Sequence, residues 1–542
     1  MLKNFRPLAP SFLLLLLVLL LFVLGGFRPA TARSLDLFSQ IEWHPWERPY
    51  LKTGVVAPSA VRPLSPNAPD PAVQAPDPDA QAPAREQSDA RPGTLYLEIG
   101  ADLQPEAYFD TDRPQRAYAG TMEREEPLGR LNTFFGFVDG PRLVTQTVLR
   151  REHRADRFSE LFSTNVPLPA GGNPFPFENN NVNTGYVALP GRHAELVFGR
   201  QQVHIGPAPE SSLMVSSRVP YLDAARLSLS LGRLRMTSLV STLENRASEA
   251  EKQAGIPSRL TTAVYEEASP YGFGTTTILY NVHYFEYAWE RLRLGIGGQM
   301  ILARPWNPLN LGDYFPVFSW HNADLAFDNL SLILDGSYAM RPGLGLYAQL
   351  GWDDINGETF GVQDSDIPTI FGGILGLAYS GEKANGRLGA LGEAGYTHYL
   401  WGSYYDSLAL SRAVYRQETD DGPRSMPLTS PYGPGVIWAM GELDFAWNTG
   451  LALGGGYLLR AENTEADLYT NRYEAAKRLR NAPRRFVHRF YLRSTFRPRP
   501  DIAAYVEPAA IIEAGAFRVE AQAGMALQYR YRRVVSSDRE EG

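Results

Sequence analysis

The sequence predicts an all-β fold, a large antiparallel transmembrane β-barrel of about 16–18 strands with long extracellular loops. Three observations lead to this fold class. Apolar side chains recur at every second residue, tight turns alternate with long connections, and an export signal precedes a chain with no second long apolar run. An exported chain of this kind can enter a membrane only as a closed barrel, which satisfies its backbone polar groups internally.

Period-two alternation is clearest in the last predicted strand. Its apolar positions are Phe517, Val519, Ala521, Ala523, Met525, Leu527, Tyr529 and Tyr531, and the positions between them include Arg518, Glu520, Gln522, Arg530 and Arg532. This segment is much longer than an ordinary soluble strand of about 5–6 residues. A soluble β-sandwich or propeller would also explain alternation, but not strands of this length, and no propeller repeat is visible.

Turns and loops have two distinct lengths. Tight turns are predicted at Asp139-Gly140-Pro141, Arg341-Pro342-Gly343, Asn448-Thr449-Gly450 and Arg499-Pro500. Long connections are predicted near 153–183, 245–272, 303–328, 354–369, 401–433 and 461–484. Short turns at one end and long loops at the other are typical of outer-membrane barrels.

The chain divides into four parts. Residues 1–32 have the features of a signal peptide: Lys3 and Arg6, an apolar run from Phe12 to Leu24 that is shorter than the ~18 residues of a membrane span, and the cleavage pattern Ala30-Thr31-Ala32. An uncleaved anchor is the alternative. Residues 33–93 are predicted to be a disordered linker, because nine prolines lie between 58 and 92. The barrel occupies 94–535, and 536–542 form a polar tail.

Composition excludes several function classes. Lys and Arg total 52 and Asp and Glu total 59, a net charge of −7, which argues against nucleic-acid binding. The absence of cysteine excludes disulfides and thiolate metal sites. The eight histidines lack metal-ligand spacing, and no common catalytic motif occurs. The sequence therefore predicts a non-enzymatic protein without cofactor or metal.

Residues 198–216 carry a family resemblance. Gly199, Arg200, Gln201, Gly206 and Pro207, followed by a Ser- and Leu-containing segment, resemble a signature of the capsule assembly Wzi family of outer-membrane proteins. Tyr347 and Gln349, followed by Asp353 and Asp354, resemble a second piece of that family. The likeness spans about residues 94–532. His204-Ile205 stand where the family often has a tryptophan, and the Pro-rich linker stands where better-known members have a helical bundle.

The resemblance implies a lectin-like barrel in the outer membrane of a Gram-negative-type bacterium. Such a barrel helps to attach or assemble capsular or extracellular polysaccharide at the cell surface, so its implied partners are polysaccharide and outer-membrane lipid. The alternative function is a porin-like channel for a small solute.

Several residues have two possible roles. Arg200 with Gln201 contacts a ligand, or Arg200 pairs with an acid inside the barrel. The Asp353-Asp354 segment is a polar loop or a calcium site. The inward arginines attract anionic sugars, or they pair with inward acids such as Glu520; they are Arg226, Arg291, Arg293, Arg489, Arg493, Arg497, Arg518, Arg530 and Arg532.

Two predicted loops are rich in aromatic residues. Loop 303–328 contains Trp306, Tyr314 and Trp320, and loop 401–433 contains Tyr404 and Tyr405. Aromatic faces flanked by Asn and Asp suit sugars, which present an apolar C–H face and hydroxyl groups. We expect these five residues to form part of a polysaccharide-binding surface. The alternative is an aromatic girdle, or packing of the loops against each other.

Overall fold

The computed structural model describes residues 54–57, 59–62, 94–111, 128–137, 140–149, 154–156, 159–166, 179–209, 211–256, 276–305, 327–355, 368–403, 409–419, 422–499 and 501–537. The predicted signal peptide and most of the predicted linker lie outside the described residues.

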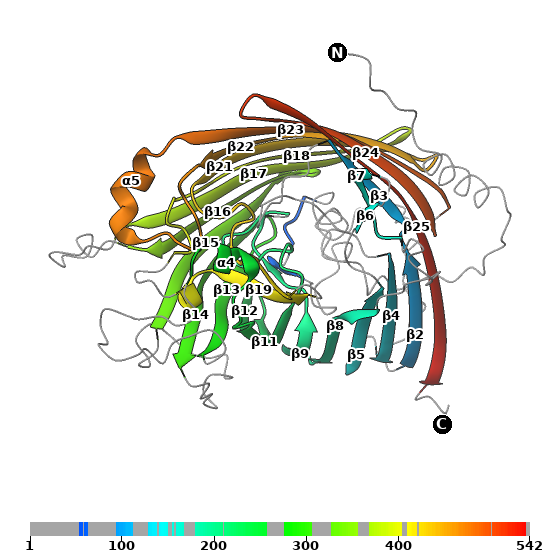
Figure 1. The fold of residues 1–542 in the computed structure, drawn as a ribbon. Helices are drawn as coiled ribbons and strands as arrows, with labels where there is room; N and C mark the ends of the chain where they lie inside the picture. The colour runs from blue at the N-terminus through cyan, green and yellow to red at the C-terminus, as the bar shows by residue number, and fades with distance from the viewer. Residues whose placement is uncertain are drawn as a thin grey trace, which may run out of the picture.

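Eighteen antiparallel strands form one closed barrel (Figure 1). They are β2 (Thr94–Leu103), β4 (Gly129–Phe137), β5 (Arg142–Leu149), β8 (Asn179–Pro190), β9 (Ala194–Gln201), β11 (Leu222–Leu231), β12 (Leu234–Leu243), β13 (Thr276–Ala288), β14 (Leu292–Pro305), β15 (Phe327–Arg341), β16 (Leu344–Asp354), β17 (Ile370–Lys383), β18 (Gly386–Thr397), β21 (Val436–Trp447), β22 (Leu451–Asn463), β23 (Arg484–Arg499), β24 (Ile502–Glu513) and β25 (Ala516–Ser537). β25 closes the ring by pairing with β2, where Tyr531 lies opposite Ile99. The predicted fold class is confirmed.

The wall has an apolar outer face. On β25, Phe517 and Tyr529 are 67% and 63% exposed, whereas Arg518 and Glu520 on the inner face are buried. The same division holds along β17, where Leu375 and Leu377 point outward. Alternate side chains of a strand point to opposite faces, so one face meets lipid and the other meets the lumen.

The two ends of the barrel differ as the sequence predicts. Tight turns join β4 to β5, β15 to β16, β21 to β22 and β23 to β24, and the chain enters β2 and leaves β25 at this same end. Longer connections leave the opposite end between β5 and β8, β12 and β13, β14 and β15, β16 and β17, β18 and β21, and β22 and β23. In outer-membrane barrels the short-turn end faces the periplasm and the long-loop end faces the exterior.

Smaller elements lie in the connections, in the lumen or in the barrel sheet beside β25. They are β1 (Val61–Arg62), β3 (Glu106–Asp110), β6 (Arg154–Asp156), β7 (Ser159–Thr164), β10 (His204–Ile205), β19 (Val414–Thr419) and β20 (Gly422–Pro427), with α4 (Glu249–Gln253), η3 (Ala409–Ser411), η4 (Tyr473–Ala475) and α5 (Ala476–Asn481). Of these, β3, β6 and β7 continue the barrel sheet beside β25. Within the described part of the chain, no helix has both the length and the apolar character needed to cross a membrane.

Two predicted boundaries need correction. Residues 54–57 and 59–62, which we call the strap, fall in the predicted disordered linker, yet their side chains are buried and Val61 pairs with Ile205. The strap is ordered because valines and alanines between its prolines meet apolar lumen residues. At the other terminus, β25 continues through Ser537 into the predicted tail, since Thr94 pairs with Ser537.

Candidate functional site

A plug fills the lumen beside strands β11–β18 and β21. We define the plug as the strap together with residues 202–209, 211–221, 398–403, 409–419 and 422–435. Its Ile205, Leu213 and Met214 are fully buried and form one apolar cluster with wall residues, among them Tyr280 and Trp438. Figure 1 shows β19 within the ring of strands. Each buried side chain of this size stabilises the packing by roughly 1.5–3 kcal/mol, so the plug is a packed core.

The first family-like segment begins at the end of β9. Gly199 has φ +125°, and a Cβ there would lie 2.3 Å from the carbonyl oxygen of Gly185, so the backbone position requires glycine. Arg200 donates two hydrogen bonds to Asp223, at 2.7 and 2.8 Å, and its guanidinium lies 3.9 Å from the centre of the Tyr221 ring. Arg200 thus pairs with an acid, but the pair is not enclosed, since the Arg200 and Asp223 side chains are 26% and 47% exposed.

Gln201 and Gly206 lead the chain from the wall into the plug. Gln201 is buried and donates to the carbonyl oxygen of Ala224 at 3.2 Å. Gly206 has φ +147°, and its N–H donates to the carbonyl oxygen of Ala60 in the strap at 3.2 Å. Pro207 follows it, also buried. Here these residues hold the plug's backbone and leave little surface for a ligand.

The second family-like segment contacts the first. The side-chain oxygen of Gln349 on β16 accepts from the N–H of Leu213 at 2.7 Å, and Gln299 donates to the carbonyl oxygen of Leu213 at 2.8 Å. The Leu213 peptide is therefore held on both sides. Because wall side chains bind both backbone groups at Leu213, this contact fixes the position of the plug.

Glu393 on β18 joins the same two segments, although it was not among the predicted site residues. One carboxylate oxygen accepts from Ser211 at 2.5 Å and from the Trp438 indole at 3.1 Å, and the other accepts from the Tyr347 hydroxyl at 2.9 Å. A buried carboxylate with several donors is satisfied without a cation. The inward position of Glu393 within an alternating strand was the only available signal.

Asp353 and Asp354 fasten the long-loop end. Asp353 is buried and accepts from Ser331 at 2.5 Å and from the N–H of Gly402 at 2.8 Å. Asp354 accepts from the Tyr473 hydroxyl. Among the described residues, no group of three or more His, Cys, Asp or Glu side chains is arranged to hold a metal ion. Asp353 and Asp354 therefore form hydrogen bonds within the protein, as expected for a polar loop.

The strap enters the lumen at the short-turn end. The N–H of Val56 donates to the carbonyl oxygen of Glu290 in the β13–β14 turn at 3.0 Å. Further in, Glu286 accepts from the Ser59 hydroxyl at 2.6 Å and from the N–H of Ala60 at 2.5 Å. These hydrogen bonds attach the strap to the wall along its length.

The long-loop end has a rigid cap made of α4 and the β19–β20 hairpin. Glu251 and Arg416 form an ion pair at 2.7 Å in which both side chains are 0% exposed. Burial raises the pKa of Glu251, but the Arg416 charge and hydrogen bonds from Arg416 and Ser248 outweigh it, so its pKa lies below the usual 4.5. Ser248 also caps α4 through a reciprocal capping box.

Most of the inward arginines on β23 and β25 pair with acids. Arg489 and Arg493 contact Glu507, at 3.1 and 2.7 Å. Arg518, Arg530 and Arg532 pair with Glu520, Asp102 and Glu98. This is the pairing network that the sequence offered as the alternative to an anion-attracting lumen. Arg226 on β11 differs from them, because its Nε and Nη1 have no acceptor among the described residues.

The predicted aromatic contact residues Trp306, Tyr314, Trp320, Tyr404 and Tyr405 lie outside the described residues. Their role stays a prediction.

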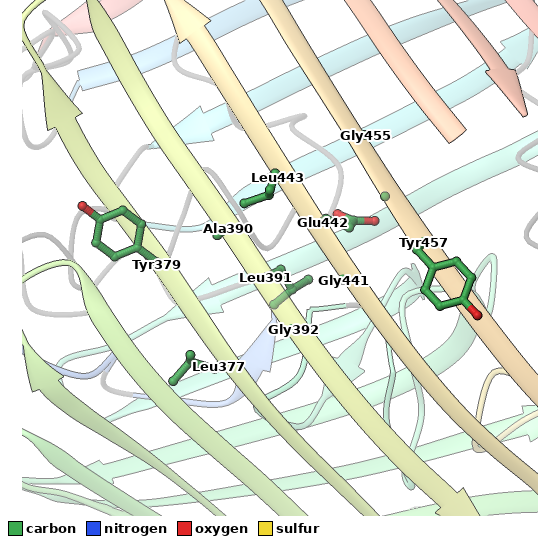
Figure 2. Close-up of a pocket in the computed structure, with 11 residues that line it drawn as sticks. Leu377, Tyr379, Ala390, Leu391, Gly392, Gly441, Glu442, Leu443, Gly455 and Tyr457 are labelled. Atoms are coloured by element: carbon green, nitrogen blue, oxygen red, sulfur yellow. The ribbon is translucent and has the colours of Figure 1, made fainter. Parts of the chain in front are cut away.

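An apolar groove lies on the outer wall across β17, β18, β21 and β22 (Figure 2). It has a volume of about 440 Å³, its floor includes Gly392 and Gly441, and Leu377, Leu443 and Tyr457 line it. These residues share the outward face of their strands, as the strand pairing shows. The groove therefore belongs to the lipid-facing surface and is separate from the plug.

No family model and no curated protein matches this sequence. Among solved structures, the fold is similar to that of Wzi, a carbohydrate-binding β-barrel of the outer membrane involved in group 1 capsule assembly in Escherichia coli. The TM-score is 0.50 at 13% identity, covering 89% of this chain and 97% of Wzi. OccD1 (OprD) gives a TM-score of 0.41 at 11% identity, covering 82% and 98%. OpdK of Pseudomonas aeruginosa gives 0.40 at 9%, covering 80% and 99%.

The likeness to Wzi concerns the fold, because the identity is low. Together with the closed barrel and its apolar outer face, it identifies an outer-membrane β-barrel of a Gram-negative cell envelope. The predicted localisation is confirmed.

Proposed function

We propose that this barrel binds capsular or extracellular polysaccharide at the cell surface and helps to attach or assemble it there, without catalysing a reaction. The observation that carries the proposal is the packed plug. Tyr347, Gln349 and Glu393 point into the lumen, as the polar residues of a water-filled channel do, but they hold Ser211 and Leu213 of the plug. Because these wall side chains bind the plug, the barrel is better suited to binding at its long-loop end than to passing solutes through its lumen.

The family resemblance supports the same proposal. Its two pieces, near Gly199–Pro207 and Tyr347–Asp354, are far apart in sequence and both border the plug. Wzi, whose fold this chain shares, is a carbohydrate-binding barrel. We infer that sugar is bound at the long-loop end, where the cap provides a rigid base for the surrounding loops.

The proposed sugar contacts are Trp306, Tyr314, Trp320, Tyr404 and Tyr405. A stacked aromatic ring contributes on the order of 1 kcal/mol, so several rings are needed for useful affinity. The experiment replaces Trp306, Trp320, Tyr404 and Tyr405 together with Ala and measures polysaccharide retained on cells. Retention should fall while the barrel keeps its heat-modifiable gel mobility.

A matched control removes aromatics at the other end of the barrel. Tyr287 and Trp289 flank the β13–β14 short turn, with ring centres 4.4 Å apart. The Y287A/W289A variant should retain polysaccharide at the level of the unaltered protein. Unchanged retention in the four-fold variant with an intact barrel would place the sugar site elsewhere. Failure of that variant to assemble would show that its aromatics are structural.

A porin-like channel is the second candidate, and one observation favours it. The inner face of β23–β25 carries Arg493, Glu507 and Arg530, partly exposed or charged groups of the kind that line aqueous lumens. Planar-bilayer recording separates the candidates. Steady openings from the purified full chain would support a channel, and an electrically silent barrel would support the surface-binding role.

A further inference from the structure

Among the described residues, positive charge exceeds negative charge on the inner wall near the short-turn end of β5, β9, β11 and β12. The groups that interact electrostatically with Arg226 are Glu195, Arg235, Tyr186 and Arg142. Glu195 is the one carboxylate among them, and its Oε1 already accepts from Arg142 at 3.1 Å. Among the described groups around Arg226, Glu195 is thus the one carboxylate beside three guanidinium groups.

Two of these arginines are buried without a hydrogen-bond acceptor. Arg226 is 4% exposed and Arg235 is 9% exposed. Nε and Nη1 of Arg226 and Nε of Arg235 have no hydrogen-bond partner among the described residues. Oε2 of Glu195 is also without one, so a small movement would let it meet Arg226. Even then, Nε of Arg235 would still lack an acceptor.

A further described acid, Glu286, does not remove this excess of positive charge. Glu286 lies opposite Arg235 in the β12–β13 register, but it accepts from Ser59 and Ala60 and faces Arg293 at 3.7 Å. With Arg293, Glu286 and Asp335 included, four guanidinium groups stand against three carboxylates among the described residues. Burying an unpaired cation is costly, and such a cation persists in a folded protein when a counter-charge is bound.

We propose that Arg142, Arg226 and Arg235 form an anion-binding site in the lumen, which takes a carboxylate or phosphate group. Guanidinium groups bind these oxyanions through two parallel hydrogen bonds, and the unsatisfied nitrogens of Arg226 are available for them. Arg142 is the first residue of β5 and Arg235 the second of β12, each just after a tight turn. The anion therefore binds close to the periplasmic mouth.

The oxyanion has two chemical sources, free phosphate and the acidic unit of a polysaccharide. This inference goes beyond the proposed surface function, because the site lies at the opposite end of the barrel from the loops. It is tested on the purified full-length barrel, without any measurement of polysaccharide retention. A negative result in either experiment leaves the other intact.

The experiment measures the temperature at which the barrel unfolds, by heat-modifiable gel mobility. Inorganic phosphate or glucuronate is added at ionic strength matched with sodium chloride. A ligand that binds only the folded state should raise this temperature, by a shift on the order of 2 °C or more. A shift with phosphate alone indicates a phosphoryl ligand, and one with glucuronate indicates an acidic sugar. No shift with either anion overturns the proposal.

The variants test whether the shift belongs to this site. R226Q/R235Q should lose the shift. R493Q, which removes an inner-wall arginine paired with Glu507, should keep it. An equal shift in R226Q/R235Q, or its loss in R493Q, overturns the proposal, because lumen charge in general would then be responsible.

Stability without ligand gives a second readout. R226Q/R235Q removes two unpaired cations, so without added anion it should unfold no lower than the unaltered protein. A large fall would mean that the protein itself neutralises these charges, and the proposal would fail. If the Gln variants do not assemble, R226K/R235K can be tested instead. Lysine keeps the positive charge but lacks the planar guanidinium that forms two parallel hydrogen bonds, so this variant should bind phosphate at least about fivefold more weakly. Undiminished binding by R226K/R235K would overturn the proposal.

Discussion

The side-chain oxygen of Gln349 accepts a hydrogen bond from the backbone N–H of Leu213 at 2.7 Å, although 136 residues separate the two. Gln349 belongs to the barrel wall and Leu213 to the plug. The contact joins the two sequence segments that resemble the Wzi family, and it shows that both segments help to hold the plug in place. Their polar residues fix a plug inside the barrel, which is a different task from contacting a ligand directly.

Replacing Gln349 with Ala should loosen the plug. The N–H of Leu213 would be buried without an acceptor, which costs about 1–3 kcal/mol. We expect the heat-modifiable transition to move to lower temperature. Q522A is the matched control, because Gln522 lies on the inner face of β25 without a side-chain hydrogen bond among the described residues. Equal destabilisation by Q522A would contradict a specific role for Gln349.

Replacing Gly206 with Ala should destabilise the same region. Gly206 has φ +147°, and a Cβ would lie 2.8 Å from Oγ of Ser212 and 3.1 Å from Nε2 of Gln349. Strain at such a backbone position costs about 1–3 kcal/mol, and the close contacts add to it. Proteolysis of the plug in the folded barrel should become faster. G441A is the control, because its Cβ would meet nothing within 4 Å, and a similar acceleration there would rule out this explanation.

The sequence predicts the wall well because one physical rule governs each strand. Lipid contacts one face, so Phe517 and Tyr529 must be apolar, and the alternation with Arg518 is visible without knowledge of the neighbours. The short turns at Gly140 and Pro342 are visible for a similar reason, since turn residues act locally.

The plug could not be predicted in this way. Residues 202–221 and the strap have no periodicity, and their burial depends on wall residues far away in the sequence. Val55 and Val61 lie in a proline-rich segment that looks like a linker in the sequence. Their side chains are buried only because the barrel wall surrounds them. Glu393 was missed because a single inward acid in a strand does not reveal its partners.

The ion pair between Glu251 and Arg416 should make the cap sensitive to acid. The folded pKa of Glu251 lies below its usual 4.5, so the carboxylate stabilises the folded cap fully above about pH 4.5. This contribution is lost as the pH falls through the lower, folded pKa. Hydrogen exchange of the β19–β20 hairpin, corrected for intrinsic rates, should accelerate below pH 4.5 more than exchange in the wall strands.

Two variants check the origin of this pH dependence. E251Q should open the hairpin already at neutral pH, because it leaves Arg416 buried without its counter-charge, at a cost of about 3–5 kcal/mol. E251M/R416M removes both charges and should keep the hairpin protected at all pH values between 3 and 7. Acid-induced opening that persists in E251M/R416M would assign the effect to another group.

Glu286 should control whether the strap stays in the lumen. Its carboxylate accepts from Ser59 and Ala60 and faces the buried Arg293 at 3.7 Å. Replacement with Ala leaves the Ser59 and Ala60 donors without their acceptor and removes one of the carboxylates that interact with Arg293, which costs about 3–5 kcal/mol. The barrel ladder does not depend on Glu286 side-chain contacts, so the wall should remain folded while the strap is released.

Proteinase K digestion of the purified barrel, followed by mass spectrometry, tests this. In the unaltered protein, residues 54–62 should be protected, because the described strap side chains are buried and Val56 and Ala60 are hydrogen-bonded to the wall. In E286A, cleavage within the strap should become the fastest event. E290A is the matched control, because Glu290 is exposed and only its backbone oxygen holds Val56. Rapid cleavage of the strap in the unaltered protein would show that these residues behave as the flexible linker that their proline-rich surroundings suggest.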